Sequence, residues 1–320
     1  MERDSGLPQV GFVGPALAVD AVRASLGPDV EFVHIPVDGH SLVSVLPQLD
    51  GLVEATTRLP LSEPAFAVAT RMQILSVAGT GDAHIDVLAA NRHGIEVRTL
   101  REDRELLETL NSTAEHAWGL LIACARQLTE AAEAVIEGEW ERERFPGVSL
   151  AGRRLGILGL GRLGRKVARY GLAFGMQVIA SDKRKPVDVP EGVEMVDLDT
   201  LFSIADVVSI HVPLEESTRG LVDRRLIGLM RSDSILVNTS RGAVLDEAAL
   251  AEAIHTRAIA GAALDVLTNE PPASDDPLIA LARSDRRLLI TPHLGGYVPE
   301  ALQTACALAA KKVSARLVGE

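Results

Sequence analysis

The sequence predicts an α/β protein whose parallel sheets are covered by helices on both faces, and three observations predict it. Short apolar runs alternate with amphipathic segments along most of the chain, which is the pattern of βαβ units. This alternation occurs twice, in the first hundred residues and again from Leu155 onward. At 320 residues the chain is also long for one compact domain. We therefore expect two α/β units.

The first unit is expected to be the smaller one. Its apolar runs predict strands at residues 10–13, 31–35, 51–55, 73–77 and 95–99. Helical patterns fill the intervals, at residues 16–26, 41–49, 63–70 and 85–91. Regular alternation of this kind predicts a parallel sheet covered on both faces.

One long helix is predicted after the first unit. It starts at a capping box formed by Ser112 and Glu115, and its helical period continues to about Ile136. The charged segment 137–144 that follows has no period and predicts an extended surface arm. Trp140 and Phe145 would be costly to leave in water, so we expect them to pack on a neighbouring surface, such as a second subunit.

The second unit is expected to be a full doubly wound domain. Strands are predicted at residues 155–158, 177–180, 194–196, 206–210, 234–238, 261–266 and 287–291. Helices are predicted at residues 162–174, 198–204, 224–230, 246–255 and 277–282. A last amphipathic helix, 299–317, follows this unit, and we expect it to return to the first one.

The stretch 155–182 carries the most informative motif of the chain. An apolar strand runs into the turn GLGRLG, a helical pattern follows, and a second strand ends at Asp182. Gly159 permits the tight turn, Gly161 lets a phosphate approach the backbone, and Gly164 lets helix and strand pack closely. Asp182 lies 21 residues after Gly161, where a carboxylate can accept hydrogen bonds from an adenosine ribose. Together these features predict a dinucleotide site on the helix N-terminus.

Three further segments place a charged or titratable residue directly after a predicted strand. These residues are Arg241, Glu270 and His293. Singly, each has a structural explanation, because Arg241 could pair with Asp246, Glu270 could be a solvated loop acid, and His293 could cap its strand. Strand ends in a doubly wound sheet lie at one edge, so we expect the three side chains beside the nicotinamide end of the dinucleotide.

Such a trio suits hydride transfer between a nicotinamide and a 2-oxo acid. The carbonyl oxygen needs a proton donor, and a histidine supplies one near neutral pH. A carboxylate on the far ring nitrogen fixes the tautomer and stabilises the imidazolium. An arginine binds the substrate carboxylate through two parallel hydrogen bonds.

Composition and charge restrict the partners. A net charge of -12 argues against a nucleic-acid or anionic-membrane partner. The first ten residues predict no signal peptide, and no apolar run approaches the length of a membrane span. Cys124 and Cys306 lie in apolar helical patterns and are expected to be reduced core thiols. We therefore expect a cytoplasmic protein, and with no closed set of His or Cys ligands we predict no metal site.

Seven segments resemble the D-isomer-specific 2-hydroxyacid dehydrogenases, and together they extend over roughly residues 73–300. They are GTGDAHIDV (79–87), NSTAEHAWGLL (111–121), LGILGLGRLGRKVARYGLAFGMQVIASD (155–182), HVPLEESTRGLV (211–222), LVNTSRGAVLDEAAL (236–250), AGAALDVLTNEPP (260–272) and ITPHLGG (290–296). The resemblance implies a Rossmann NAD-binding domain, 110–294, and a smaller flavodoxin-like substrate domain, 1–109, completed by the C-terminal helix 295–320. It also implies a homodimer, with the helix from Ser112 and the arm in the contact.

The resemblance also assigns roles. It makes His293 the acid/base, Glu270 its carboxylate partner and Arg241 the residue that binds the substrate carboxylate, while main-chain amides at Thr80 and Gly81 assist. The cofactor-binding set it implies is Gly159, Gly161, Arg162, Leu163, Gly164, Asp182, Val212, Thr239, Ser240, Asp265 and His293, with Asp265 near the carboxamide.

Departures from the family pattern concern the substrate and the cofactor. Asp82 places a negative charge in the glycine loop unless it points away or binds a cation, and Glu54 stands where phosphoglycerate-specific members tend to carry an arginine, with Arg58 only later. A phosphorylated substrate is therefore disfavoured. Asp182 favours NAD, although the basic run 183–185 leaves NADP open.

A rival reading from another class is an NAD-sensing, non-catalytic regulator on the same fold, of the co-repressor kind. The intact set of Arg241, Glu270 and His293 disfavours this regulator hypothesis. It does not exclude it, because co-repressors of the family keep the same three residues. Turnover of small 2-hydroxy or 2-oxo acids separates the two readings.

Overall fold

The computed structural model describes residues 6–56, 59–184 and 188–319, which form two compact units. Unit 1 contains the residues up to Leu110 together with those from Tyr297 onward. Unit 2 extends from Asn111 to Gly296. The chain thus passes from unit 1 to unit 2 after Leu110 and returns to unit 1 after Gly296.

Unit 1 is built on a five-stranded parallel sheet in the order β2-β1-β3-β4-β5. Its strands are β1 (Gln9–Val13), β2 (Glu31–Ile35), β3 (Gly51–Glu54), β4 (Ile74–Val77) and β5 (Glu96–Arg98). Its helices are α1 (Val19–Leu26), α2 (Gly39–Val45), α3 (Glu63–Val68), α4 (Val87–Arg92), α5 (Arg104–Thr109) and α13 (Pro299–Val318), with 3-10 turns at Ala16–Ala18 and Leu46–Gln48.

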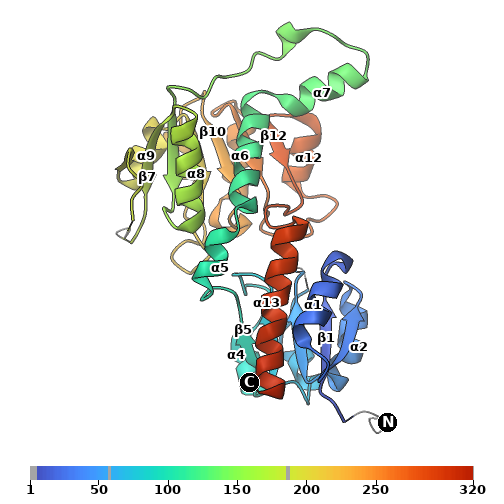
Figure 1. Cartoon of the computed structure of the whole chain (residues 1–320). Helices are drawn as coiled ribbons and strands as arrows, with labels where there is room; N and C mark the ends of the chain where they lie inside the picture. Colours follow the sequence, from blue (N-terminus) through green and yellow to red (C-terminus); the bar gives the residue numbers. More distant parts are fainter. Residues whose placement is uncertain (1–5, 57–58, 185–187, 320) are drawn as a thin grey trace. The chain divides into compact units, whose positions relative to one another are not determined.

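Two apolar layers cover the faces of this sheet. On one face α2, α3 and α4 pack over β3 and β4 around Leu52 and Leu75. On the other face α1 and α13 bury Val22, Ala309 and Val313. Figure 1 shows the red α13 beside the blue α1 and the strands of this unit. The last helix therefore shares one hydrophobic core with α1 and β1.

Unit 2 is built on a seven-stranded parallel sheet in the order β12-β11-β10-β9-β6-β7-β8. Its strands are β6 (Arg154–Leu158), β7 (Gln177–Ser181), β8 (Val193–Met195), β9 (Val207–Ile210), β10 (Ile235–Asn238), β11 (Gly261–Leu264) and β12 (Leu288–Ile290). Its helices are α6 (Ser112–Ala125), α7 (Leu128–Ile136), α8 (Arg162–Ala173), α9 (Leu198–Ile204), α10 (Arg224–Leu229), α11 (Glu247–His255) and α12 (Pro277–Ser284), with 3-10 turns at Arg142–Arg144 and Gly242–Val244.

Helices cover both faces of this second sheet as well. On one face α8 packs against β6 and β7, and α6 packs against β10 and β11 (Figure 1). Leu121 of α6 and Val167 of α8 are buried in this layer. On the other face α9, α10, α11 and α12 bury Phe202, Leu250 and Leu278. The predicted α/β class with a doubly wound domain is therefore confirmed.

Each sheet contains one point at which the strand order reverses. In unit 1 the reversal falls between β1 and β3, and in unit 2 it falls between β6 and β9. Connections leave these two strands toward opposite sides, which opens a crevice beyond their carboxyl ends where open α/β sheets bind ligands.

The prediction of one helix over residues 112–136 was wrong in detail. The helix ends at Ala125, and α7 begins at Leu128 after Gln127, whose φ of 50° lies in the left-handed region. The expected capping box was also wrong, because Asn111 is the N-cap residue and no side chain caps this helix. Helix α5 was not predicted at all.

The segment between α7 and β6 is an arm with one short 3-10 turn, Arg142–Arg144. Trp140, which was expected to pack on a surface, is 86% exposed within this chain. Ile136 at the end of α7 is equally exposed. The arm and α7 therefore present apolar side chains that the chain itself does not cover.

Candidate functional site

His293 and Glu270 form a direct pair in unit 2. Glu270 follows β11, and His293 follows β12, its neighbour in the sheet. The Nδ1 atom of His293 lies 2.6 Å from Oε2 of Glu270. The carboxylate thus accepts the Nδ1 proton, which fixes the tautomer and leaves Nε2 as the ring nitrogen not engaged by Glu270.

The charge of Glu270 is favoured by its surroundings. Burial raises the pKa of this carboxyl, but the hydrogen bond and charge of His293, the Leu267 N–H and the charge of Arg241 together hold the pKa below its usual range. Oε1 accepts the Leu267 N–H at 2.9 Å. Glu270 is therefore a fixed carboxylate that stabilises a positive charge on His293.

Arg241 lies near enough for its charge to lower the pKa of Glu270, and the turn that carries it packs against the loop of Glu270. A Cβ added at Gly242 would meet the Leu267 carbonyl carbon at 1.9 Å, so only glycine lets the 241–242 turn lie against the loop that carries Glu270. The Arg241 Nη1 group donates to the carbonyl of Ser240 at 2.6 Å. The Asp246 side chain caps α11, where it accepts the Ala249 N–H at 2.9 Å.

The backbone of His293 is held by Asp265, the residue that directly follows β11. The Asp265 carbonyl accepts the His293 N–H at 2.9 Å. Its carboxylate accepts the Leu294 N–H at 2.7 Å and the Gly295 N–H at 2.8 Å. These three bonds fix a residue whose φ of 57° lies in the left-handed region.

His116 of α6 belongs to the same network. Its Nε2 lies 3.1 Å from Asp265 Oδ1 and 3.0 Å from Thr291 Oγ1, and Thr291 also donates to Asp265 at 2.6 Å. Burial raises the pKa of Asp265, but the hydrogen bonds from His116, Thr291 and the two amides hold it below its usual range. A helix residue and two strand ends thus support the loop of His293.

The glycine turn of unit 2 has the shape that a pyrophosphate needs. Gly159 has a φ of 92°, and a Cβ there would lie 2.9 Å from the backbone of His211 and 2.8 Å from Val212. A Cβ at Gly161 would meet nothing within 4 Å, whereas one at Gly164 would collide with the Gly159 carbonyl at 2.0 Å. The turn is therefore closed at both ends and open in the middle, directly before the N-terminus of α8.

Polar groups at the neighbouring strand ends also suit a dinucleotide. Asp182 accepts the Leu160 N–H and the Arg184 N–H, each at 2.8 Å, which holds its carboxylate beside the glycine turn. Thr239, at the end of β10, has a buried hydroxyl with no hydrogen-bond partner in the described part of the chain. Ser240 donates instead to Asn238. Of the basic run, Lys183 and Arg184 are described, and Lys185 lies outside the described residues.

The expected substrate loop of unit 1 follows β4. The carbonyl of Thr80 accepts from Arg101, whose Nη2 also lies 3.3 Å from Asp82 Oδ1. Asp82 thus has the cationic neighbour that its position required. Gly81 lies between these two anchored residues, and Arg58 lies outside the described residues.

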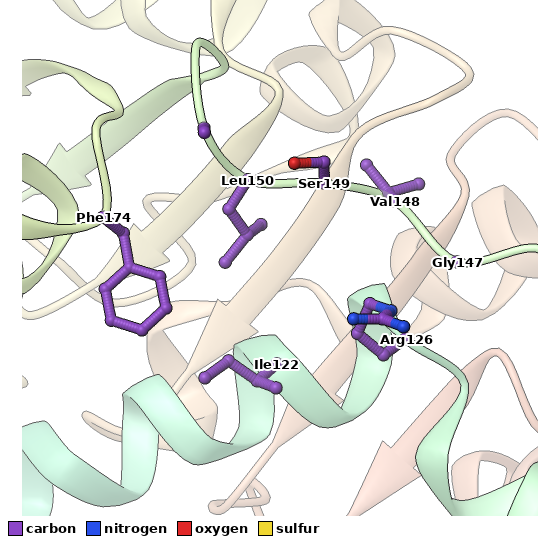
Figure 2. Close-up of a pocket in the computed structure, with 8 residues that line it drawn as sticks. Ile122, Arg126, Gly147, Val148, Ser149, Leu150 and Phe174 are labelled. Carbon is purple, nitrogen blue, oxygen red and sulfur yellow. The ribbon is translucent and has the colours of Figure 1, made fainter.

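A groove of about 460 Å³ lies elsewhere on unit 2. Figure 2 shows Leu150 and Phe174 above α6, which contributes Ile122 and Arg126. None of the candidate site residues lines it. Among residues 6–56, 59–184 and 188–319 there is no cluster of three potential metal ligands, and no described helix is long and apolar enough to cross a membrane.

Comparison with known proteins identifies relatives of this chain. Residues 118–295 match the family model described as D-isomer specific 2-hydroxyacid dehydrogenase, NAD binding domain. Hydroxypyruvate reductase of Thermotoga maritima is 38% identical, covering 85% of this chain and 86% of the relative. D-3-phosphoglycerate dehydrogenase of Methanocaldococcus jannaschii is 39% identical over 79% of this chain, which spans about half (47%) of that relative.

A solved structure extends the likeness to the whole fold. D-lactate dehydrogenase of Aquifex aeolicus, complexed with NAD and lactic acid, superposes with a TM-score of 0.83 at 27% identity. The match covers 97% of this chain and 96% of that one. Both units therefore have counterparts in a single solved protein.

Proposed function

The chain belongs to the D-isomer-specific 2-hydroxyacid dehydrogenases, a family of NAD-dependent oxidoreductases, and from that premise we propose that it interconverts a small 2-hydroxy acid and its 2-oxo acid. The observation that carries the proposal is the 2.6 Å contact between His293 Nδ1 and Glu270 Oε2, within the electrostatic reach of Arg241. A proton donor, a carboxylate and a guanidinium are the groups that reduction of a 2-oxo acid requires.

His293 is the acid/base in this proposal. When bound, NADH supplies the hydride that reduces the carbonyl carbon. The carbonyl oxygen then gains a proton, and Nε2 of His293 donates it, because Nδ1 is engaged by Glu270. The Glu270 carboxylate stabilises the imidazolium before the transfer and orients the ring throughout. In the oxidative direction His293 accepts the hydroxyl proton.

Arg241 binds the substrate carboxylate. Its planar guanidinium carries five N–H donors in a fork that matches a carboxylate, and the bond from Nη1 to the Ser240 carbonyl helps to hold the side chain in place. Main-chain amides at Thr80 and Gly81 of unit 1 are proposed to assist. Unit 1 is accordingly the substrate domain and unit 2 the cofactor domain.

The cofactor-binding residues are proposed from the shape of the glycine turn. Gly159, Gly161 and Gly164 form the turn, the amides of Arg162 and Leu163 would bind the pyrophosphate, and Asp182 would bind the ribose. Val212, Thr239, Ser240, Asp265 and His293 complete the set. A carboxylate at position 182 repels a 2′-phosphate, so NAD is the preferred form.

Two further properties belong to the proposal. Exposed apolar side chains on α7 and the arm, including Ile136 and Trp140, support a homodimer. Two unpaired cysteines, Cys124 and Cys306, support a reducing, cytoplasmic compartment.

Oxidation of NADH tests the proposed function. The purified chain is mixed with NADH and one of five acids: glyoxylate, pyruvate, hydroxypyruvate, 2-oxoglutarate or 3-phosphohydroxypyruvate. We expect turnover of at least one of the unphosphorylated acids, abolished when the acid is omitted. Binding of NADH without turnover of any acid, in either direction, would contradict the proposal and favour an NAD-sensing regulator.

A further inference from the structure

A second glutamate–histidine pair lies in unit 1, outside the site described above. Glu54, the last residue of β3, is 0% exposed, and its Oε2 lies 3.0 Å from Nε2 of His84. Its Oε1 accepts the N–H and the hydroxyl of Thr56, at 2.6 and 2.5 Å. Burial raises the pKa of Glu54, but the bonds from His84 and Thr56 hold it below the usual range. Glu54 is therefore a buried carboxylate to which Nε2 of His84 donates.

The pair lies where this sheet is built to bind a ligand. Glu54 stands opposite Val13 in the register of β3 and β1, the two strands between which the strand order reverses. Open α/β sheets bind ligands beyond the carboxyl ends of the strands at this point. His84 follows β4 in the loop that begins with Gly79 and contains Thr80 and Gly81. The pair thus adjoins the loop proposed to hold the substrate carboxylate.

The backbone around His84 is fixed. Its carbonyl accepts the Leu61 N–H at 2.9 Å, and the next residue, Ile85, donates its N–H to Asp82 at the same distance. The His84 side chain is 12% exposed, so its ring is largely buried but still reachable. With the ring anchored through Nε2, Nδ1 is the atom left for a ligand, and no hydrogen bond to it is found among the described residues.

The chemistry of the pair selects a class of ligand. Nδ1 accepts a hydrogen bond when the ring is neutral and donates one when it is protonated. A hydroxyl group satisfies both states, because it donates and accepts. A dianionic phosphate ester has only acceptor oxygens, so it cannot donate a hydrogen bond to Nδ1 of the neutral ring.

We propose that His84, oriented by Glu54, is a specificity-determining residue of unit 1 that binds the hydroxyl group of a short 2-oxo acid hydroxylated at carbon 3. This inference rests on the proposed function and narrows its substrate class. Hydroxypyruvate has this hydroxyl, pyruvate is the same acid without it, and 3-phosphohydroxypyruvate carries a phosphate in its place. Comparing the kinetics of these three acids therefore measures the contribution of the contact between His84 and the hydroxyl group at carbon 3.

The test compares the wild-type chain with His84→Gln, in which a side-chain amide can still donate to Glu54 but Nδ1 is gone. We expect KM for hydroxypyruvate to rise about tenfold, as for the loss of one hydrogen bond, with kcat unchanged. Both constants for pyruvate should stay within twofold. An unchanged ratio of kcat/KM between the two acids would overturn the inference, as would a wild-type preference for 3-phosphohydroxypyruvate over hydroxypyruvate.

A second measurement needs neither the variant nor turnover. In the wild-type chain with ¹⁵N-labelled histidine, hydroxypyruvate added without NADH should shift the Nδ1 resonance of His84, whereas pyruvate should not. Equal responses to both acids, or none, would overturn the inference. Failure of every acid to be reduced would instead contradict the proposed function, so the two failures are distinguishable.

Discussion

At the scale of single residues, the candidate site depends on the orientation and the tautomer of the His293 ring. Glu270 accepts a hydrogen bond from Nδ1–H of His293, and Asp265 holds the backbone of the same loop through the bonds to residues 293, 294 and 295. Orientation of the ring is thus determined by side chain and main chain together. A proton donor positioned in this way lowers the barrier without moving during the reaction.

The first prediction concerns His293. Replacing it by alanine should lower kcat at least a hundredfold, because general acid catalysis contributes roughly 10²–10⁴-fold. The Kd for NADH, measured by fluorescence titration, should change far less than kcat, because the glycine turn and Asp182 remain to bind the cofactor. Replacing the exposed His255, at the end of α11, by alanine is the matched control and should leave both values unchanged. Turnover by the His293 variant within threefold of the wild type would remove this residue from the mechanism.

A second prediction concerns pH. Burial lowers the pKa of His211 to about 4. Between about pH 6.5 and pH 4 the unfolded chain binds a proton at this residue that the folded chain does not, so stability contributed by the neutral ring is lost as pH falls through that window. The free energy of unfolding, measured with urea at pH 7.5 and 4.5, should therefore fall less for His211→Gln than for the wild type. Parallel losses in both proteins would contradict the direction of the shift.

At the scale of elements, the strand pattern was the most reliable guide. Every predicted strand exists, with each end displaced by at most two residues, because continuous apolar runs between turns are typical of buried parallel strands. The break at Gln127 could not be predicted, since a left-handed residue other than glycine leaves no local signal. Helix α5 was missed because its six residues carry too short a period.

The sequence identified the main residues of the candidate site but not the contacts between distant segments that support them. Arg241, Glu270 and His293 could be named because each follows an apolar strand. The link between His116 and Asp265 joins residues 149 positions apart, and only the packing of α6 on the sheet creates it. The pairing of Glu54 with His84 was equally hidden, because nothing in either segment indicates which side chains meet across two strand ends.

The third prediction separates two glycines of one turn. Gly159→Ala should destabilise unit 2 by about 1–3 kcal/mol, because its φ of 92° and the contact with His211 both exclude a side chain. Gly161→Ala should destabilise much less, since open space surrounds its Cβ position, yet weaken NADH binding at least tenfold by blocking the approach of a phosphate. Thermal unfolding without cofactor and NADH titration measure the two effects. Unchanged NADH affinity in the Gly161 variant would place the pyrophosphate elsewhere.

At the scale of the whole molecule, the surface of unit 2 predicts association. Trp140 and Ile136 are each 86% exposed, and Val135 is 50% exposed. Large apolar side chains gathered on one helix and the adjoining arm are typical of an interface. We therefore expect the purified chain to be a dimer by sedimentation equilibrium.

The fourth prediction tests that association. Trp140→Ser should weaken the dimer at least tenfold, because a buried aromatic side chain dominates an interface. The control is Leu88→Ser, which removes a side chain that is 72% exposed on α4 of unit 1. The control should leave the dissociation constant unchanged. A monomeric wild-type chain, or equal effects of the two variants, would contradict the proposed contact.

The placement of α13 has a consequence for how the protein is made. The sheet of unit 1 is translated first, but the helix that buries Phe12 and Val53 on one of its faces is translated after all of unit 2. During translation, unit 2 can therefore fold while the face of the unit 1 sheet that α13 later covers is still exposed. We expect chaperones to bind this exposed apolar face on the nascent chain. A chain terminated before residue 299 would leave unit 1 incompletely folded and prone to aggregate.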